Sequence, residues 1–191
     1  TEHIPAMLSV PGVTHAFRYE TAESDVQRYL TIYAFNESGL TNTDQWKQSS
    51  GVGQWPHRIR PYFRNQQSVE YRSMGVHITN DSKEALYIFV VCLDVDPAYE
   101  DKFNKVYDSE HFPYVMKTPG ILRGERFQTT SNGDVQKYMT LFEMDNPEIP
   151  FTKEFRMNAE YGAWPEYVRP HTRRTKRVVF NKMRNMLDGP S

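Results

Sequence analysis

The sequence of 191 residues contains a long internal repeat, and this feature constrains the fold more than any other. A Glu-His-x-Pro motif occupies residues 2–5 and again residues 110–113, at an offset of 108. Further pairs align at an offset of 109: segment 25–31 with 134–140, Trp55 with Trp164, and Arg60 with Arg169. Because the matched blocks keep their order and differ by one inserted residue, we predict a tandem duplication with repeats at 1–80 and 81–191.

The second repeat has the complete order of elements of a known supersecondary unit. Its patterning predicts strands at 85–95, 121–129, 134–144 and 172–183, and helices at 98–117 and 152–168. The order β-α-β-β-α-β is that of the ferredoxin-like unit. In the first repeat we expect the end of the first helix, then strands at 14–19, 26–35 and 68–74. Its first strand is missing and the sequence begins at Thr1, so we expect a longer parent chain.

The composition excludes several classes of protein. A net charge of −1 gives no global attraction to nucleic acid or to an anionic membrane. The longest strongly apolar run, 85–93, is too short to span a bilayer. The single cysteine, Cys92, excludes internal disulfides and a multi-cysteine zinc site, and it favours the cytoplasm. Aromatic residues reach 14%, enough for both a core and a ring-lined pocket.

The motif Tyr107-x-x-Glu110-His111-x-Pro113 in a duplicated ferredoxin-like unit resembles the dimeric α+β barrel superfamily, and within it the EthD-like branch. The resemblance covers nearly all of the chain. It implies an α+β fold in which the antiparallel sheets of two ferredoxin-like βαββαβ repeats pack face to face as a barrel. Members of the superfamily include cofactor-free monooxygenases, lactone isomerases, lyases and haem-binding proteins. One tandem chain can complete such a barrel, or it can pair with a second copy. Both a monomer and a homodimer are therefore compatible with the sequence.

His111 is the leading candidate for a catalytic residue. The residues that share its predicted helix face are Phe103, Tyr107 and Tyr114. A neutral imidazole can accept or donate a proton near neutral pH. Pro113 removes a backbone donor, so the helix should deform beside the histidine. The alternative for His111 is a core histidine bonded to a backbone carbonyl. In the first repeat, His3 is the matching candidate for a catalytic residue.

Other polar and aromatic residues are weaker candidates. Glu110 either orients the histidine, pairs with an arginine or stays solvated, and Tyr107 either donates to a substrate oxygen or fills the core. Candidates for contacting a substrate are Tyr29 and Tyr138 in matched strands, Arg126, Trp164, Tyr114 and His171. A solvated face is predicted for the basic cluster Arg169, Arg173, Arg174, Lys176 and Arg177.

These observations favour a small-molecule enzyme that works without a bound organic cofactor or metal. Its substrate would be hydrophobic, aromatic or polyketide-like, and His111 would provide acid/base chemistry in a lyase, an isomerase or a cofactor-free monooxygenase. A haem-binding protein with His111 as axial ligand is one alternative. A non-catalytic binding or assembly module with a filled core is another.

Overall fold

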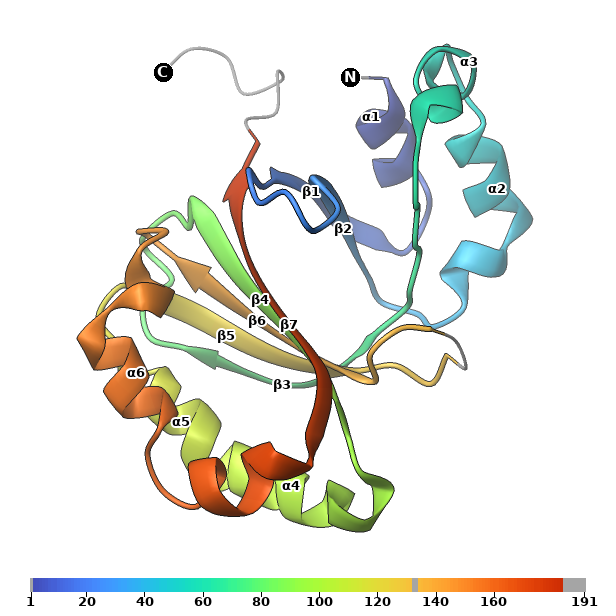
Figure 1. Cartoon of the computed structure of the whole chain (residues 1–191). Helices are drawn as coiled ribbons and strands as arrows, with labels where there is room; N and C mark the ends of the chain where they lie inside the picture. Colours follow the sequence, from blue (N-terminus) through green and yellow to red (C-terminus); the bar gives the residue numbers. More distant parts are fainter. Residues whose placement is uncertain (1, 132–133, 184–191) are drawn as a thin grey trace. The chain divides into compact units, whose positions relative to one another are not determined.

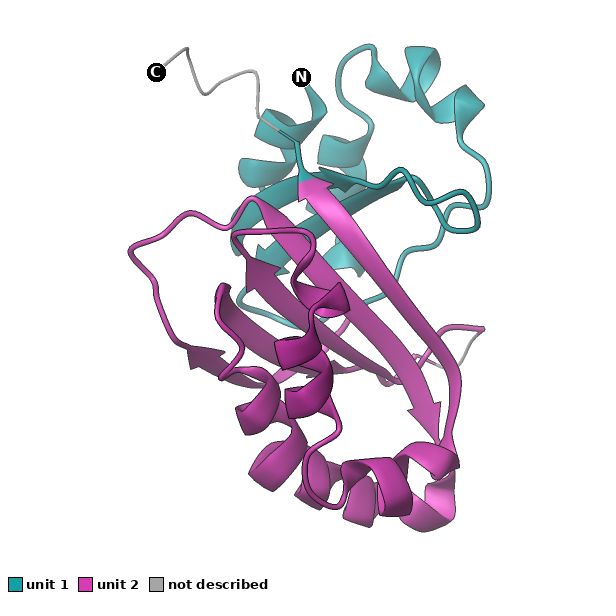
Figure 2. Cartoon of the chain, turned by 60° about the vertical axis from the view of Figure 1, so that its left-hand side comes forward, with its two compact units in different colours: residues 1–70, 182–191 teal, residues 71–181 magenta. Residues whose placement is uncertain are grey.

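The computed structural model describes residues 2–131 and 134–183, which form two compact units. Figure 2 shows unit 1 (residues 1–70 with 182–191) and unit 2 (residues 71–181). The elements of unit 1 are α1 (His3–Leu8), β1 (Val13–Glu20), β2 (Tyr29–Phe35), α2 (Asp44–Ser50) and α3 (Trp55–Arg58), with 3-10 turns at Leu40–Asn42 and Arg60–Tyr62. The strands of unit 2 are β3 (Arg72–Ile78), β4 (Tyr87–Val95), β5 (Ile121–Gln128), β6 (Tyr138–Met144) and β7 (Thr172–Lys182). Its helices are α4 (Glu100–Val106), α5 (Phe112–Val115) and α6 (Lys153–Ala159), with π turns at Tyr107–His111 and Trp164–Val168 and 3-10 turns at Pro97–Tyr99, Ile149–Phe151 and Arg169–His171.

Unit 2 confirms the predicted α+β class. Its strands pair in the order β7-β4-β6-β5-β3, and every one of these pairs is antiparallel. Along the chain, β4, α4, β5, β6, α6 and β7 follow the predicted β-α-β-β-α-β order of the ferredoxin-like unit. The helices α4, α5 and α6 cover one face of this sheet (Figure 1), and the main apolar core lies on that face.

The strand that ends the first sequence repeat belongs to unit 2. It was predicted at 68–74, but β3 runs from Arg72 to Ile78 because Val76 and Ile78 continue its alternation of apolar residues. It pairs with β5, with Val76 opposite Glu125. The compact units therefore divide between residues 70 and 71, whereas the repeats divide between 80 and 81.

The central strand β4 is buried on both faces, as its continuous apolar sequence predicts. Phe89 and Leu93 face the helices and are 5% and 4% exposed. Ile88 and Val90 point to the opposite face and are 1% and 8% exposed. This strand provides the floor on which the candidate site is built.

The first long helix of unit 2 deforms at the predicted place. Asp96 caps its start by accepting a hydrogen bond from the Ala98 amide. Five residues, Tyr107–His111, form a π turn between α4 and α5. Pro113 lacks the amide hydrogen that would bond four residues back in an α-helix, and a π turn accommodates this gap. His111 consequently lies at the end of an irregular helical turn.

The second predicted helix, 152–168, is wrong as a continuous element. After α6 the chain passes through Gly162, whose φ of +74° ends the helical geometry, and then enters the second π turn. A Cβ on Gly162 would lie 2.3 Å from Oε2 of Glu110, so this close approach requires glycine. At this interruption the chain contacts the carboxylate of Glu110, on the neighbouring helical segment.

The described helices are all short. None of them is long and apolar enough to cross a membrane.

Candidate functional site

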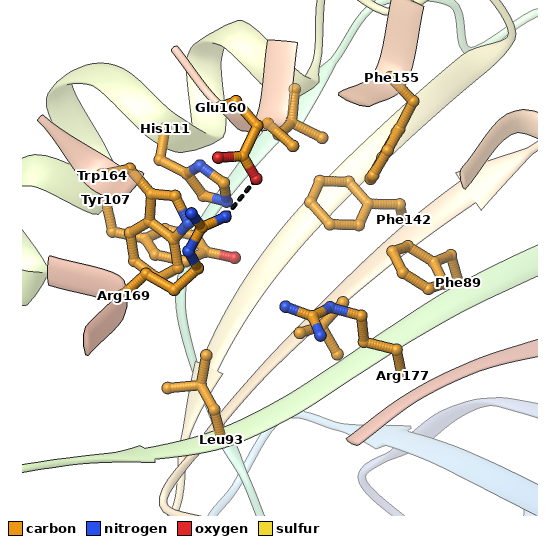
Figure 3. A pocket seen from close by; sticks show the side chains of 13 residues that line it. Phe89, Leu93, Tyr107, His111, Phe142, Phe155, Glu160, Trp164, Arg169 and Arg177 are labelled. Atoms are coloured by element: carbon orange, nitrogen blue, oxygen red, sulfur yellow. Dashed lines mark hydrogen bonds and ion pairs between the residues drawn. The ribbon is translucent and has the colours of Figure 1, made fainter. Parts of the chain in front are cut away.

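A small cavity in unit 2 lies between the helical layer and the sheet (Figure 3). Its volume is about 70 Å³. At a share of about 30 Å³ per molecule in liquid water, this is room for about two waters. It is lined by Phe89, Val91, Leu93, Tyr107, His111, Val115, Phe142, Phe155, Ala159, Glu160, Trp164, Arg169 and Arg177. The inner wall is therefore mostly aromatic and aliphatic, and the charged groups come from Glu160, Arg169 and Arg177.

His111 lines this cavity, and one of its ring nitrogens has no hydrogen-bond partner in the described part of the chain. The side chain is only 8% exposed, and its Nδ1 atom has no hydrogen-bond partner among residues 2–131 and 134–183. The backbone of Ala159 lies beside the ring and interacts with it.

His111 is neutral at physiological pH. Burial lowers its pKa to about 3, and the positive charges of Arg177, Arg126 and Arg169 add to this effect. The hydrogen bond with Ala159 acts in the opposite direction but is weaker than the burial. A neutral imidazole can accept a hydrogen bond or a proton. It does so more readily when the ligand also brings a negative charge, because that charge offsets the charges of the arginines.

Two aromatic side chains fix the orientation of this imidazole. Trp164 stacks on the ring at 4.2 Å between centroids and 22° between planes. Tyr107 approaches it edge-on at 4.9 Å, and its hydroxyl forms a 2.8 Å hydrogen bond with Oγ1 of Thr140. Burial raises the pKa of Tyr107, so this hydroxyl stays protonated. Both predicted residues line the cavity beside His111.

The predicted basic cluster does not share one role. Arg173 pairs with Asp96, and Arg174 pairs with Asp94 and Asp134, in accord with a solvated face. Arg177, by contrast, reaches from β7 to the cavity, as Figure 3 shows. Arg169 also lines it and forms an ion pair with Glu160. Both of these arginines are exposed, as predicted for the cluster, and in addition they line the cavity.

Glu110 does not line the cavity, yet it contacts the segment that does. Its Oε2 accepts a 2.8 Å hydrogen bond from the Ala163 amide, next to Gly162 and immediately before Trp164. The carboxylate therefore ties the π turn that carries His111 to the π turn that carries Trp164. This contact differs from the two surface roles expected for Glu110, an ion pair with an arginine and a solvated carboxylate.

Arg126 and Tyr138 belong to a neighbouring polar network outside the cavity. Arg126 is 3% exposed, pairs with Asp108 and donates to Oδ1 of Asn104 at 3.0 Å. Tyr138 donates to Glu100 and accepts from Asn104. Burial, with the hydrogen bond to Glu100, raises the pKa of Tyr138 to about 12. Within this arrangement Arg126 supports Tyr107 by lying 4.2 Å from the centre of its ring.

The remaining candidates lie apart from the cavity. Tyr114 stacks on Tyr161 at 3.4 Å, and His171 stacks on Tyr99 at 3.3 Å. Tyr29, in unit 1, is 56% exposed. None of these three side chains lines the cavity of unit 2.

His3 in unit 1 has the same local surroundings as His111. Its ring stacks on Trp55 at 3.9 Å and 5°, and its Nδ1 has no hydrogen-bond partner in the described part of the chain. Burial, together with Arg60 and Arg18, lowers its pKa. Glu2 accepts a 3.0 Å hydrogen bond from the Gln54 amide, next to Gly53, whose φ is +76°. The arrangement of glutamate, glycine, tryptophan and histidine thus occurs in both units.

Sequence reasoning missed the phenylalanine wall and the charged groups of the cavity. Phe89, Phe142 and Arg177 each lie on a different strand, β4, β6 or β7. Because side chains alternate between the two faces of a strand, one residue known to face the helices is enough to assign the face of the others on its strand. Val179 packs on the helix-side core, and Arg177 lies two residues before it. Glu160 had no comparable signal, because the turn after α6 depends on contacts distant in sequence.

The described residues contain no group of three or more histidine, cysteine, aspartate or glutamate side chains arranged to hold a metal ion.

No family model matches the sequence, and no curated protein is significantly similar to it. Three solved structures are similar in fold. A candidate monooxygenase from Fusobacterium nucleatum subsp. nucleatum is 13% identical with a TM-score of 0.64, over 96% of this chain and 82% of that chain. A second candidate monooxygenase, from Lactobacillus acidophilus NCFM, is 15% identical with a TM-score of 0.53, over 95% of this chain and 85% of that chain.

The third structure is named an anthrone oxidase-like protein. It is 9% identical to this chain with a TM-score of 0.59, over 96% of this chain and 82% of its own. Identities this low show a shared fold and carry no information on the reaction. The chain therefore has the ferredoxin-like α+β fold of these solved structures.

Proposed function

We propose that this chain is a small-molecule enzyme of the α+β barrel type that performs acid/base chemistry in the cavity of unit 2. The observation that carries the proposal is the free Nδ1 of buried, neutral His111 beside an aromatic cavity. A buried polar atom without a partner costs free energy, so its retention favours a functional use.

His111 would accept a proton or a hydrogen bond from an acidic O–H or C–H group of the substrate. Its low pKa makes it a weak base in the empty site, because burial disfavours the charged ring and the charges of Arg177 and Arg169 add to this effect. The same two arginines would stabilise the anion that remains on the substrate after proton transfer. The base is thus matched to a substrate whose conjugate anion is delocalised, such as a phenol, an enol or an anthrone.

The reaction that follows proton transfer would be an elimination, an isomerisation or an oxygenation. The names of the three similar structures, two candidate monooxygenases and an anthrone oxidase-like protein, support including molecular oxygen as a co-reactant in the tests. Aromatic and polyketide-like rings fit the phenylalanine, tyrosine and tryptophan lining.

The variant His111→Phe tests the proposal. Phenylalanine keeps a flat ring on Trp164 but removes both nitrogens, whereas His171→Phe removes a histidine outside the cavity. On a panel of acidic ring compounds that includes anthrone, His111→Phe should lower turnover by about 100-fold or more, the usual contribution of a general acid or base. The matched His171→Phe variant should retain turnover. Full activity of His111→Phe on a compound that the wild type converts would refute the assignment.

Haem binding by His111 has less support. Trp164 covers one face of the imidazole, and a porphyrin would have to displace far more of the lining of the 70 Å³ cavity than a single aromatic ring would. A filled module is also disfavoured, because the space beside His111 is open. The acid/base proposal alone accounts for both the cavity and the free nitrogen.

We further propose that the chain arose by tandem duplication within the EthD-like branch. The motif offsets support it, and so does the matched geometry of His3 with Trp55 and of His111 with Trp164. Under this proposal His3 is the counterpart of the catalytic histidine in the first repeat.

A further inference from the structure

The opening of the cavity carries an uncompensated positive charge. Two guanidinium groups, Arg169 and Arg177, line it together with one carboxylate, Glu160. Glu160 forms its ion pair with Arg169. Arg177 has no ion pair or side-chain hydrogen bond within the described ranges 2–131 and 134–183. The lining groups therefore leave a net charge of +1.

Nothing deeper in the cavity neutralises this charge. His111 and Tyr107 are both uncharged at neutral pH, for the reasons given above. The other inner lining residues are apolar, and Phe89 and Phe142 are among them (Figure 3). A ligand matched to this lining combines one flat apolar body with one negative charge.

A guanidinium recognises one anion better than others. Its planar fork of N–H donors matches the two oxygens of a carboxylate, with two parallel hydrogen bonds. Arg177 extends from strand β7, where it pairs with Val91 of the central strand β4, so the fork is presented from the sheet.

We propose that the site binds an aromatic monocarboxylate, with its carboxylate on Arg177 and its ring against the phenylalanine side chains. This inference deepens the proposed function, on which it rests for the reaction but not for the binding. It makes Arg177 the residue that determines specificity, and it places the ring beside His111.

The size of the cavity adds a condition. A space that encloses benzene measures about 150 Å³, roughly twice the 70 Å³ found here. A bound ring must therefore extend into the opening or displace the segment after α6. The Glu160–Arg169 pair that holds this segment is exposed, and exposed ion pairs contribute little stability. Its rupture would also release Arg169 for the ligand.

The test is a ¹⁹F NMR titration with 4-fluorobenzoate and its neutral isostere 4-fluorobenzamide at low salt. The wild type should bind the acid at least about tenfold more tightly than the amide, the usual gain from a charged hydrogen bond. Arg177→Met should abolish this preference. The matched control Lys176→Met removes the same charge from the adjacent residue, which faces the other side of β7, and should keep the preference. Glu160→Gln should increase it.

Several outcomes would overturn the inference. These are equal affinity for the acid and the amide, a preference that survives Arg177→Met, an equal loss in Lys176→Met, or no binding of either compound at millimolar concentration. Thermal unfolding midpoints establish that each variant is folded. Because the titration involves no turnover, its failure is distinct from that of the proposed function. His111→Phe should lose activity while it retains the preference for the acid.

Discussion

His111 is buried without a carboxylate partner, so the stability of the protein should depend on pH in a defined direction. Its pKa is about 3 in the folded state and about 6.5 in an unfolded chain. Between these values the unfolded chain binds a proton that the folded chain does not bind. The free energy of unfolding therefore falls as the pH drops from about 6.5 to about 3, by about 1.4 kcal/mol per unit and about 4 kcal/mol in total.

Urea denaturation of His111→Phe and the wild type at pH 7 and pH 4 measures this dependence. At pH 7 the variant should lie within about 1 kcal/mol of the wild type, since one hydrogen bond is exchanged for apolar contact. At pH 4 it should be the more stable protein by about 2–3 kcal/mol, because it has no imidazole to protonate. His171→Phe serves as control and should follow the wild type. Parallel curves for wild type and His111→Phe would contradict the neutral buried imidazole.

At the residue scale the sequence singled out the histidine, tyrosine and tryptophan that line the cavity, but not the arginine that lines it from β7. The spacing placed His111 and Tyr107 on one helix face, the repeated Trp-Pro motif singled out Trp164, and all three line the cavity, while their roles in a reaction stay predictions. Arg177 was hidden among basic neighbours, because alternation along a strand does not reveal which face is inward. The role of Arg126 follows only from the structure, which shows its ion pair with Asp108.

At the scale of elements, the contact between Glu110 and Gly162 determines how the two π turns meet. An alanine at Gly162 would need a positive φ and would displace the Glu110 carboxylate from the Ala163 amide. We expect Gly162→Ala to cost about 1–2 kcal/mol for the backbone and about 2 kcal/mol more for the lost charged hydrogen bond. Turnover should fall as well, since Trp164 follows in the chain and packs on His111.

Gly39 provides a matched control for this prediction. Its φ is +81°, and a Cβ there would meet no atom within 4 Å. Gly39→Ala should therefore show the backbone cost alone, about 1–2 kcal/mol in chemical denaturation. In a Glu110→Ala background the cost of Gly162→Ala should fall to the same value. Equal costs for the two glycine substitutions in the wild-type background would exclude a contribution from Glu110.

The interrupted helix also shows what periodicity cannot predict. Residues 152–168 read as one helix because local patterning carries no trace of a carboxylate 52 residues earlier, at Glu110. The deformation at His111 was predictable, because its cause, Pro113, lies within the same helix. Local causes are visible in a sequence, whereas causes that depend on tertiary contacts are not.

At the scale of the whole molecule, the sequence repeats and the compact units do not coincide. β3 is encoded in the first repeat and completes the sheet of unit 2 through β5. At the other end, the Met183 amide of unit 1 donates a 2.8 Å hydrogen bond to the carbonyl of Arg18 in β1. Each repeat therefore ends in the unit built mainly from the other repeat. Similarity between segments of the sequence does not report which strands pair.

This exchange predicts how a cleaved chain behaves. A protease site inserted in the exposed segment 81–84 would separate the two sequence repeats covalently. The N-terminal fragment would still contain β3, paired with β5 of the C-terminal fragment. A second site between Gln66 and Gln67 is the matched control, because β3 then stays with the C-terminal fragment. After cleavage, size-exclusion chromatography in increasing urea would measure the association of each pair of fragments.

The fragments cleaved at 81–84 should stay together to a higher urea concentration than those cleaved between Gln66 and Gln67. The reason is that the seven-residue ladder of β3 must be broken in the first case and stays intact within one fragment in the second. Identical dissociation midpoints, or immediate separation after cleavage at 81–84, would mean that β3 contributes nothing to holding the halves together. The boundary of the repeats would then also be the boundary of the folding units, contrary to the pairing of Val76 with Glu125.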